Sequence, residues 1–216
     1  MKNFALILSG CGQHDGSETH EVILTLLSMS QENITWESFA PDIYQERVVD
    51  HLTNQIEQDQ KRSVLKESAR LVRGKISPLN ELDVSKFDAI IFPGGFGSVS
   101  TLCNWAHQSL DFEIHSDVKK ILDQATLVRK PLGFICIAPI LATKIYKSAK
   151  ITIGNDKNIA QQIHDLGAQH IECTANEVVI DKENKIVSTP ANMVANNINE
   201  VYEGIRRLVK ELVLLS

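Results

Sequence analysis

Short apolar runs, each long enough for one buried strand, are the feature that most constrains the fold of this chain. Three of them are continuous: Phe4–Leu8, Ala89–Phe92 and Leu132–Ile137. A continuous apolar run of this length is typical of a parallel strand that helices cover on both faces. A helix that spans a bilayer needs about 20 apolar residues, so we expect no membrane segment and no membrane partner.

The segments between these runs carry the apolar spacing of amphipathic helices. Four segments show it: the one that follows residues 15–18, then 117–127, 158–166 and a long C-terminal stretch from Val194. Further strands are expected at Ile34–Phe39 and Ile151–Ile153, and a β-hairpin at residues 178–181 and 185–188. The alternation of strands and helices predicts an α/β fold with a mostly parallel sheet and helices on both faces.

The length of 216 residues suits one domain with a sizeable core, which we place over residues 1–216. Residues 42–80 are more polar and contain two amphipathic stretches, near 45–58 and 62–72. This part is too short to have a core of its own. We therefore interpret it as a long crossover insertion within the single domain.

Charge and composition narrow the classes of function. The formal net charge of −5 argues against nucleic acid as a partner, because phosphate binding needs a basic face. The chain begins with a short apolar run that fits a strand better than a signal peptide, so we expect a reducing, cytoplasmic location. The spacing of Cys11, Cys103, Cys136 and Cys173 fits no zinc or redox motif. We expect free thiols and no metal.

Cys136 is the strongest candidate for chemistry. It follows the apolar run of residues 132–135 directly, and small and apolar residues that can begin a helix follow it. A thiol at a strand-to-helix turn lies near the positive end of a helix, which predicts a lowered thiol pKa and a nucleophilic thiolate. The alternative is an ordinary buried cysteine that packs as a small hydrophobe.

Small residues also follow the neighbouring strands. This matters because ligand-binding sites in parallel sheets form at the carboxyl ends of the strands. Gly94 and Gly95 leave backbone N–H groups uncovered, as an oxyanion hole requires. The N–H of Ile137, directly after Cys136, can supply a second donor, as in a nucleophile elbow. A phosphate site at this turn is disfavoured, since the residues of a P-loop and of a dinucleotide fingerprint are missing.

The first helix opens with Glu18 and Glu21. Either can serve as a general acid or base beside the thiol, or can simply stabilise the helix N-terminus. A catalytic carboxyl group there must be partly protonated, because a carboxylate would raise the thiol pKa. Cys11 and His20 lie near the end of the first strand and are possible pocket residues, although packing or surface roles are the simpler interpretation of both.

Four motifs, in this order along the chain, resemble the ElbB family (enhancing lycopene biosynthesis protein, also called sigma cross-reacting protein) of the ThiJ/PfpI class I glutamine amidotransferase-like superfamily. They are DGSETHE (15–21), PGGFG (93–97), GFICIAP (133–139) and DKENKIVSTPA (181–191). The resemblance covers nearly the whole chain, including residues 42–80. It implies a flavodoxin-like three-layer sandwich, with Cys136 at the nucleophile elbow.

The resemblance also implies roles for individual residues. Glu21 corresponds to the superfamily glutamate that hydrogen-bonds the cysteine, and Gly95 and Ile137 match the positions whose N–H groups form the oxyanion hole. The implied activity is a cofactor-independent glyoxalase (glyoxalase III-like), a lyase that converts glyoxal or methylglyoxal to a hydroxy acid without glutathione. By analogy with the superfamily, we also expect a homodimer.

One feature departs from the superfamily pattern. Many members have a histidine directly after the nucleophile or some twenty residues beyond it, whereas Ile137 follows Cys136 and the next histidine is His164. This argues against a catalytic triad, and so against glutaminase and peptidase activity. Two other functions stay open: a non-catalytic redox or stress sensor that oxidises at Cys136, and a binding or scaffold protein linked to isoprenoid metabolism.

Overall fold

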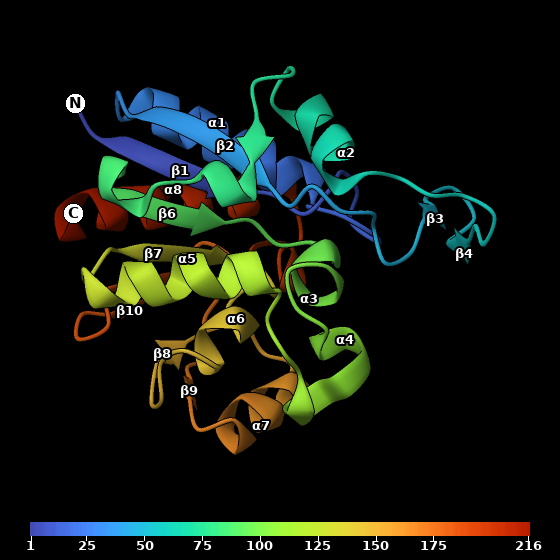
Figure 1. The fold of residues 1–216 in the computed structure, drawn as a ribbon. Helices are drawn as coiled ribbons and strands as arrows, with labels where there is room; N and C mark the ends of the chain where they lie inside the picture. Colours follow the sequence, from blue (N-terminus) through green and yellow to red (C-terminus); the bar gives the residue numbers. More distant parts are fainter.

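A seven-stranded sheet forms the centre of the computed structural model, which describes residues 1–216 (Figure 1). The strand order is β10-β11-β7-β6-β1-β2-β5, and every neighbouring pair is parallel except β10 and β11. The strands are β1 (Asn3–Ile7), β2 (Thr35–Ala40), β5 (Ser77–Pro78), β6 (Ala89–Phe92), β7 (Leu132–Ile135), β10 (Val179–Asp181) and β11 (Ile186–Thr189). The mostly parallel sheet and the C-terminal hairpin confirm the sequence prediction.

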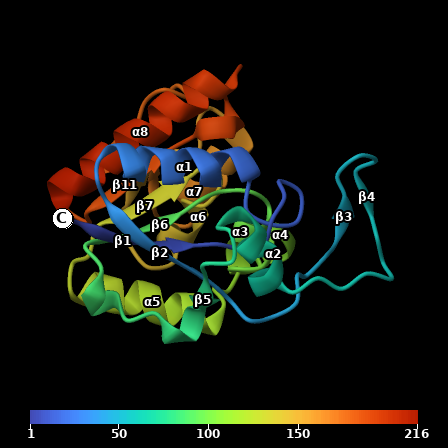
Figure 2. The ribbon, with the colours of Figure 1, turned by 90° about the horizontal axis from the view of Figure 1, so that it is seen from above.

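Helices cover both faces of the sheet, which gives three layers. Figure 2 shows α1 and α8 side by side on one face and α5 on the opposite face. The helices are α1 (Thr19–Gln31), α2 (Val64–Leu71), α3 (Gly97–Ser100), α4 (Trp105–Gln108), α5 (Ser116–Leu127), α6 (Ile140–Thr143), α7 (Lys157–Asp165) and α8 (Ile198–Leu215). None of them is long and apolar enough to cross a membrane.

The strands β6 and β7 are buried along their whole length, and β1 is buried from Phe4 on, as their continuous apolar sequences predict. The Phe92 ring on β6 stacks on the Phe134 ring on β7, with centroids 5.1 Å apart. Next to Phe134, Gly133 lets α8 approach the sheet, because a Cβ there would lie 2.7 Å from the Leu212 side chain. Burial of these aromatic and aliphatic side chains on both faces fixes the sheet as the rigid support of the strand ends.

The insertion is divided between a hairpin and a helix. The first amphipathic stretch forms β3 (Val49–Asp50) and β4 (Gln55–Ile56), which pair antiparallel and project from the body of the protein (Figures 1 and 2). Asp50 closes the turn, since its carboxylate accepts hydrogen bonds from the Leu52 N–H and the Thr53 hydroxyl. The second stretch forms α2, whose first turn is capped by Ser63.

Two expected elements differ in extent or position. The C-terminal helix begins at Ile198, after Val194, because the Asn197 side chain accepts hydrogen bonds from the N–H groups of Asn199 and Glu200 and caps it there. The strand expected at 151–153 is β8 (Lys150–Ile151). It pairs with β9 (Gln169–His170) in a separate two-stranded sheet.

The close packing of α8 on β7 gives a test of the fold. We expect Gly133→Val to lower the free energy of unfolding by about 1–3 kcal/mol, because the added methyl groups overpack the contact with α8. Urea unfolding followed by circular dichroism measures this. Leu214→Ala is the control on the same helix, since Leu214 is 76% exposed. Equal stability of Gly133→Val and wild type would contradict the packing.

Candidate active site

Cys136 occupies a strained turn directly after β7. Its φ angle is +62°, in the left-handed region that non-glycine residues rarely adopt. Its N–H donates a 2.9 Å hydrogen bond to the Thr189 carbonyl at the end of β11, which holds the turn in place. Strain of this kind costs about 1–3 kcal/mol and is concentrated at functional sites. The turn places the cysteine at the carboxyl edge of the sheet, as the sequence predicts.

The loop after β6 approaches Cys136 so closely that only glycine fits. A Cβ on Gly94 would lie 2.4 Å from the Cys136 Cβ and 2.7 Å from Glu21 Oε2. Gly95 has φ +91°, and a Cβ there would lie 2.3 Å from the Gly16 carbonyl oxygen. The backbone N–H groups of Gly95 and Ile137 both act to lower the pKa of the Cys136 thiol, so both face the sulfur and favour a negative charge on it. The two candidate oxyanion-hole donors therefore converge on the candidate nucleophile.

Glu21 is the carboxyl group of this site. It lies in the first turn of α1, has no exposed surface, and accepts a 2.9 Å hydrogen bond from the Gly94 N–H at Oε2. Glu18, at the N-cap of α1, accepts the Glu21 N–H at 2.8 Å. The structure thus resolves the ambiguity between the two acids: Glu21 is the acid beside the thiol, and Glu18 holds the start of its helix.

Asn192 joins both carboxyl groups and was missed in the sequence analysis. Its side-chain N–H₂ donates to Glu18 Oε2 at 3.0 Å and to Glu21 Oε1 at 3.1 Å, and its backbone N–H also points to Oε1, at 3.4 Å. It lies in the turn after β11, directly after the STPA residues of the fourth motif. Its place at the end of a strand neighbouring β7 was the signal that could have identified it.

Glu21 is kept protonated by its surroundings. Burial raises its pKa to about 8, and the nearby Glu18 carboxylate adds to the effect. The hydrogen bonds from Asn192 and Gly94 lower the pKa but do not outweigh burial. At neutral pH, Glu21 is therefore mainly a carboxylic acid, which can donate a proton at one oxygen and accept one at the other.

The expectation of a stable thiolate at Cys136 is wrong. Burial raises the thiol pKa well above its usual value, repulsion from Glu21 adds to this, and the Gly95 and Ile137 N–H groups offset only part of it. The helix that follows, α6, has only four residues, so its dipole contributes little. Only 7% of Cys136 is exposed. At rest the nucleophile is a thiol, and its proton must leave when a substrate binds.

The other candidate residues lie outside this hydrogen-bonded group. The His20 side chain is 60% exposed, and its Nδ1 lies 3.8 Å from Glu18 Oε1. Cys11 is half-buried against the core, where burial raises its thiol pKa. Neither side chain hydrogen-bonds Cys136 or Glu21. No histidine donates to or accepts from Cys136, so the site has no triad of the amidotransferase or protease kind.

The site has no metal-binding geometry. No group of three or more His, Cys, Asp or Glu side chains is arranged to hold a metal ion.

Access to the thiol is narrow. A cavity of about 700 Å³, lined by residues such as Thr101, His115 and Lys144, does not include Cys136 or Glu21. Only a small molecule can reach a thiol with so little exposed surface.

The raised pKa of Glu21 has a measurable consequence for stability. Between the unfolded pKa, about 4.3, and the folded pKa, about 8, only the folded state binds the extra proton. The free energy of unfolding should therefore fall as the pH rises through this window, by up to about 1.4 kcal/mol per unit.

Urea unfolding of wild type and Glu21→Gln at pH 5 to 8 tests this expectation. The variant should lose this part of the slope, because its side chain cannot ionise. Glu37→Gln is the matched control, since Glu37 is exposed on β2. The same pH slope for wild type and Glu21→Gln would show that Glu21 ionises normally.

Comparison with known proteins places this geometry in a family. A scan of the sequence against models of protein families finds no match. The chain is 37% identical to the rat protein named ES1 protein homolog, mitochondrial, over 98% of this chain and 83% of the rat protein. It is also 37% identical to the human glutamine amidotransferase-like class 1 domain-containing protein 3, mitochondrial, over 98% of this chain and 82% of the human protein.

Solved structures agree with these relatives. An isoprenoid biosynthesis protein with an amidotransferase-like domain from Ehrlichia chaffeensis superposes with a TM-score of 0.92 at 31% identity, covering 99% of this chain and 100% of that one. Drosophila melanogaster DJ-1beta, with a TM-score of 0.55 at 16% identity over 99% of this chain and 95% of that one, shares the fold. The chain therefore belongs to the ElbB/ES1 family of glutamine amidotransferase-like proteins, within the ThiJ/PfpI superfamily.

Proposed function

We propose that this protein is a cofactor-independent glyoxalase that converts small 2-oxoaldehydes such as methylglyoxal to hydroxy acids. The observation that carries the proposal is a buried Glu21, protonated at neutral pH, beside a cysteine on which two backbone N–H groups favour negative charge. This arrangement supplies a nucleophile, a proton carrier and donors for a developing negative charge. The small exposed area of Cys136 suits an aldehyde of two or three carbons.

In the first step, the Cys136 sulfur forms a bond to the aldehyde carbon, and the carbonyl oxygen becomes a hydroxyl group. The S–H proton passes to the unprotonated oxygen of Glu21 while the O–H proton of Glu21 passes to the substrate oxygen. A neutral carboxylic acid makes this exchange without separating charge in a buried site, where separated charges are costly. The Gly95 and Ile137 N–H groups stabilise the oxygen while its charge develops.

In the second step, the unprotonated oxygen of Glu21 takes the proton from the former aldehyde carbon while the O–H proton of Glu21 passes to the ketone oxygen, which gives an enediol. Glu21 then gives a proton to the neighbouring carbon and takes the hydroxyl proton from the former aldehyde carbon, which leaves a thioester on Cys136 and a hydroxyl group where the ketone was. The oxidation of one carbon is balanced by the reduction of the other, so no external oxidant is required. Water then hydrolyses the thioester, which releases the hydroxy acid and restores the thiol.

The same geometry bears on the two alternative functions, a redox sensor and a scaffold protein. Oxidation of a sensor cysteine requires thiolate character and access, and the raised pKa and burial of Cys136 oppose both. A scaffold role in isoprenoid metabolism finds support only in the name of the Ehrlichia chaffeensis relative. A cytoplasmic location and a homodimer stay predictions. The names of the rat and human relatives place those two proteins in mitochondria.

The direct test is lactate formation from methylglyoxal without glutathione. We expect activity in the wild type and none in Cys136→Ser. Glu21→Gln should lower kcat by about 10²–10⁴-fold, the usual contribution of a general acid–base. Cys11→Ser should leave the rate close to wild type, since its sulfur is outside the hydrogen-bonded group.

The chemical state of the protein decides how a negative result is understood. If the wild type forms no lactate while mass spectrometry shows reduced Cys136, the glyoxalase proposal is wrong. Peroxide oxidation of Cys136 to the sulfinic acid would then favour the sensor, and a cellular function that survives Cys136→Ser would favour the scaffold.

A further inference from the structure

The loop after β1, residues 10–18, lies between the candidate active site and the insertion. On one side it contacts the loop after β6 through three backbone hydrogen bonds. The Glu18 N–H donates to the Gly94 carbonyl at 3.0 Å, and the Phe96 N–H to the Gln13 carbonyl at 2.8 Å. The Gly97 N–H donates to the Gly16 carbonyl at 3.0 Å. The loop that leads into α1, where Glu21 lies, is thus joined by backbone hydrogen bonds to the loop that contains Gly95.

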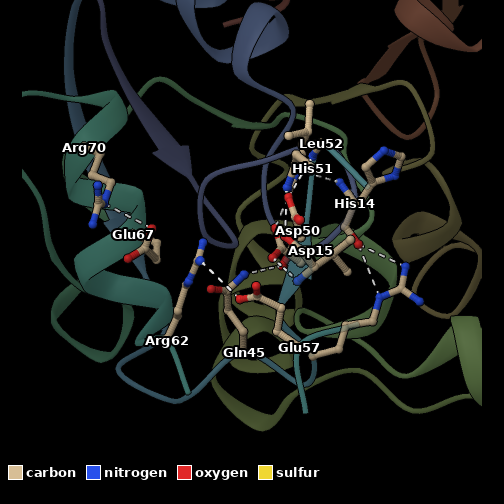
Figure 3. Close-up of polar contacts among 12 residues, drawn as sticks. His14, Asp15, Gln45, Asp50, His51, Leu52, Glu57, Arg62, Glu67 and Arg70 are labelled. Carbon is tan, nitrogen blue, oxygen red and sulfur yellow. Dashed lines mark hydrogen bonds and ion pairs between the residues drawn. The ribbon is translucent and has the colours of Figure 1, made fainter. Parts of the chain in front are cut away.

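On its other side the same loop is held by the insertion hairpin (Figure 3). The Gln45 side chain donates to the Asp15 carbonyl at 2.6 Å, and the Val49 N–H donates to the Asp15 carboxylate at 2.8 Å. The His14 N–H points to His51 Nε2, at 3.2 Å. Asp15 is only 1% exposed. The two contacts of Asp15 are buried and bind the base of the hairpin to this loop, although most of the hairpin extends away from the body.

One side chain at the base of the hairpin, just before β3, touches both loops at once. The Arg47 guanidinium donates two hydrogen bonds to the His14 carbonyl, at 3.2 and 2.9 Å. It also lies 3.7 Å from the centre of the Phe96 ring, a cation–π contact. Phe96 directly follows Gly95, whose N–H favours a negative charge on the Cys136 sulfur and so lowers the thiol pKa. Arg47 is therefore one residue removed from a backbone donor of the candidate active site.

We propose that Arg47 is a positioning residue that holds the Gly95 N–H against the Cys136 sulfur, which makes the insertion hairpin a functional part of the site. The planar guanidinium suits this task because it can stack on a ring and donate two hydrogen bonds at the same time. Lysine cannot do both. The inference concerns the site of the proposed function, but thiol reactivity tests it without aldehyde turnover.

Loss of the Arg47 contacts should lower the thiolate fraction of Cys136 and weaken the stabilisation of the transition state. A Gly95 N–H that moves away no longer stabilises the thiolate, so less thiolate forms at a given pH. A tenfold decrease in the thiolate fraction gives a tenfold decrease in alkylation rate, because the thiolate is the nucleophile. In turnover the effect should fall on kcat and leave KM nearly unchanged, because a developing charge needs this donor only in the transition state.

The experiment measures the rate of Cys136 alkylation by iodoacetamide at pH 8, by mass spectrometry, in the full-length protein. We expect about a tenfold decrease in Arg47→Met, a similar decrease in Phe96→Leu and little rescue in Arg47→Lys. The double variant should be no slower than either single variant, because both remove the same contact. Arg62→Met is the control on the same insertion, where Arg62 pairs with Glu57 at 3.9 Å.

Circular dichroism and urea midpoints confirm that each variant is folded before the rates are compared. An unchanged or faster alkylation rate in folded Arg47→Met would overturn the proposal, since the hairpin would then be only structural or a cover over the thiol. Kinetics with methylglyoxal add the kcat and KM values. Wild type that makes no lactate would refute the proposed function and leave the alkylation result to decide the role of Arg47.

Discussion

The close approach at Gly94 is the contact on which the rest of the site depends. The end of β6 passes so near the end of β7 and the start of α1 that the Cys136 Cβ, Glu21 Oε2 and the Gly94 backbone occupy one small volume. Any side chain at Gly94 would separate the thiol from the acid. The parallel sheet provides this proximity, since its strands end at the same edge, and the strained turn at Cys136 aims the sulfur into it.

The same close packing determines the protonation states of Glu21 and Cys136. A buried carboxylate next to a buried thiolate is unfavourable, so both groups hold their protons at neutral pH. The protein does not store a charged nucleophile. Instead, it places an acid with donor and acceptor oxygens beside a neutral thiol, and Asn192 keeps that acid correctly oriented. Chemistry in such a site depends on moving a proton between neighbours rather than on a stable thiolate.

The sheet could be predicted from the sequence, but the candidate active site could be predicted only in part. Continuous apolar runs identified the buried strands, and the small residues after β6 and β7 located Cys136 and Gly95. The choice of Glu21 over Glu18 came from the family resemblance alone, because one helical turn separates them. The thiol pKa was predicted wrongly, since burial depends on the whole fold. Asn192 and Arg47 lie far from Cys136 in sequence, and only tertiary contacts reveal them.

Infrared difference spectroscopy of wild type against Glu21→Gln is the most direct test of this account, because it reports the protonation state of one carboxyl group. The account predicts the carbonyl band of a protonated carboxylic acid at pH 7, in wild type only, and its loss as the pH rises through about 8. A carboxylate band for Glu21 at pH 6 to 7 would contradict the proton exchange between Glu21 and Cys136.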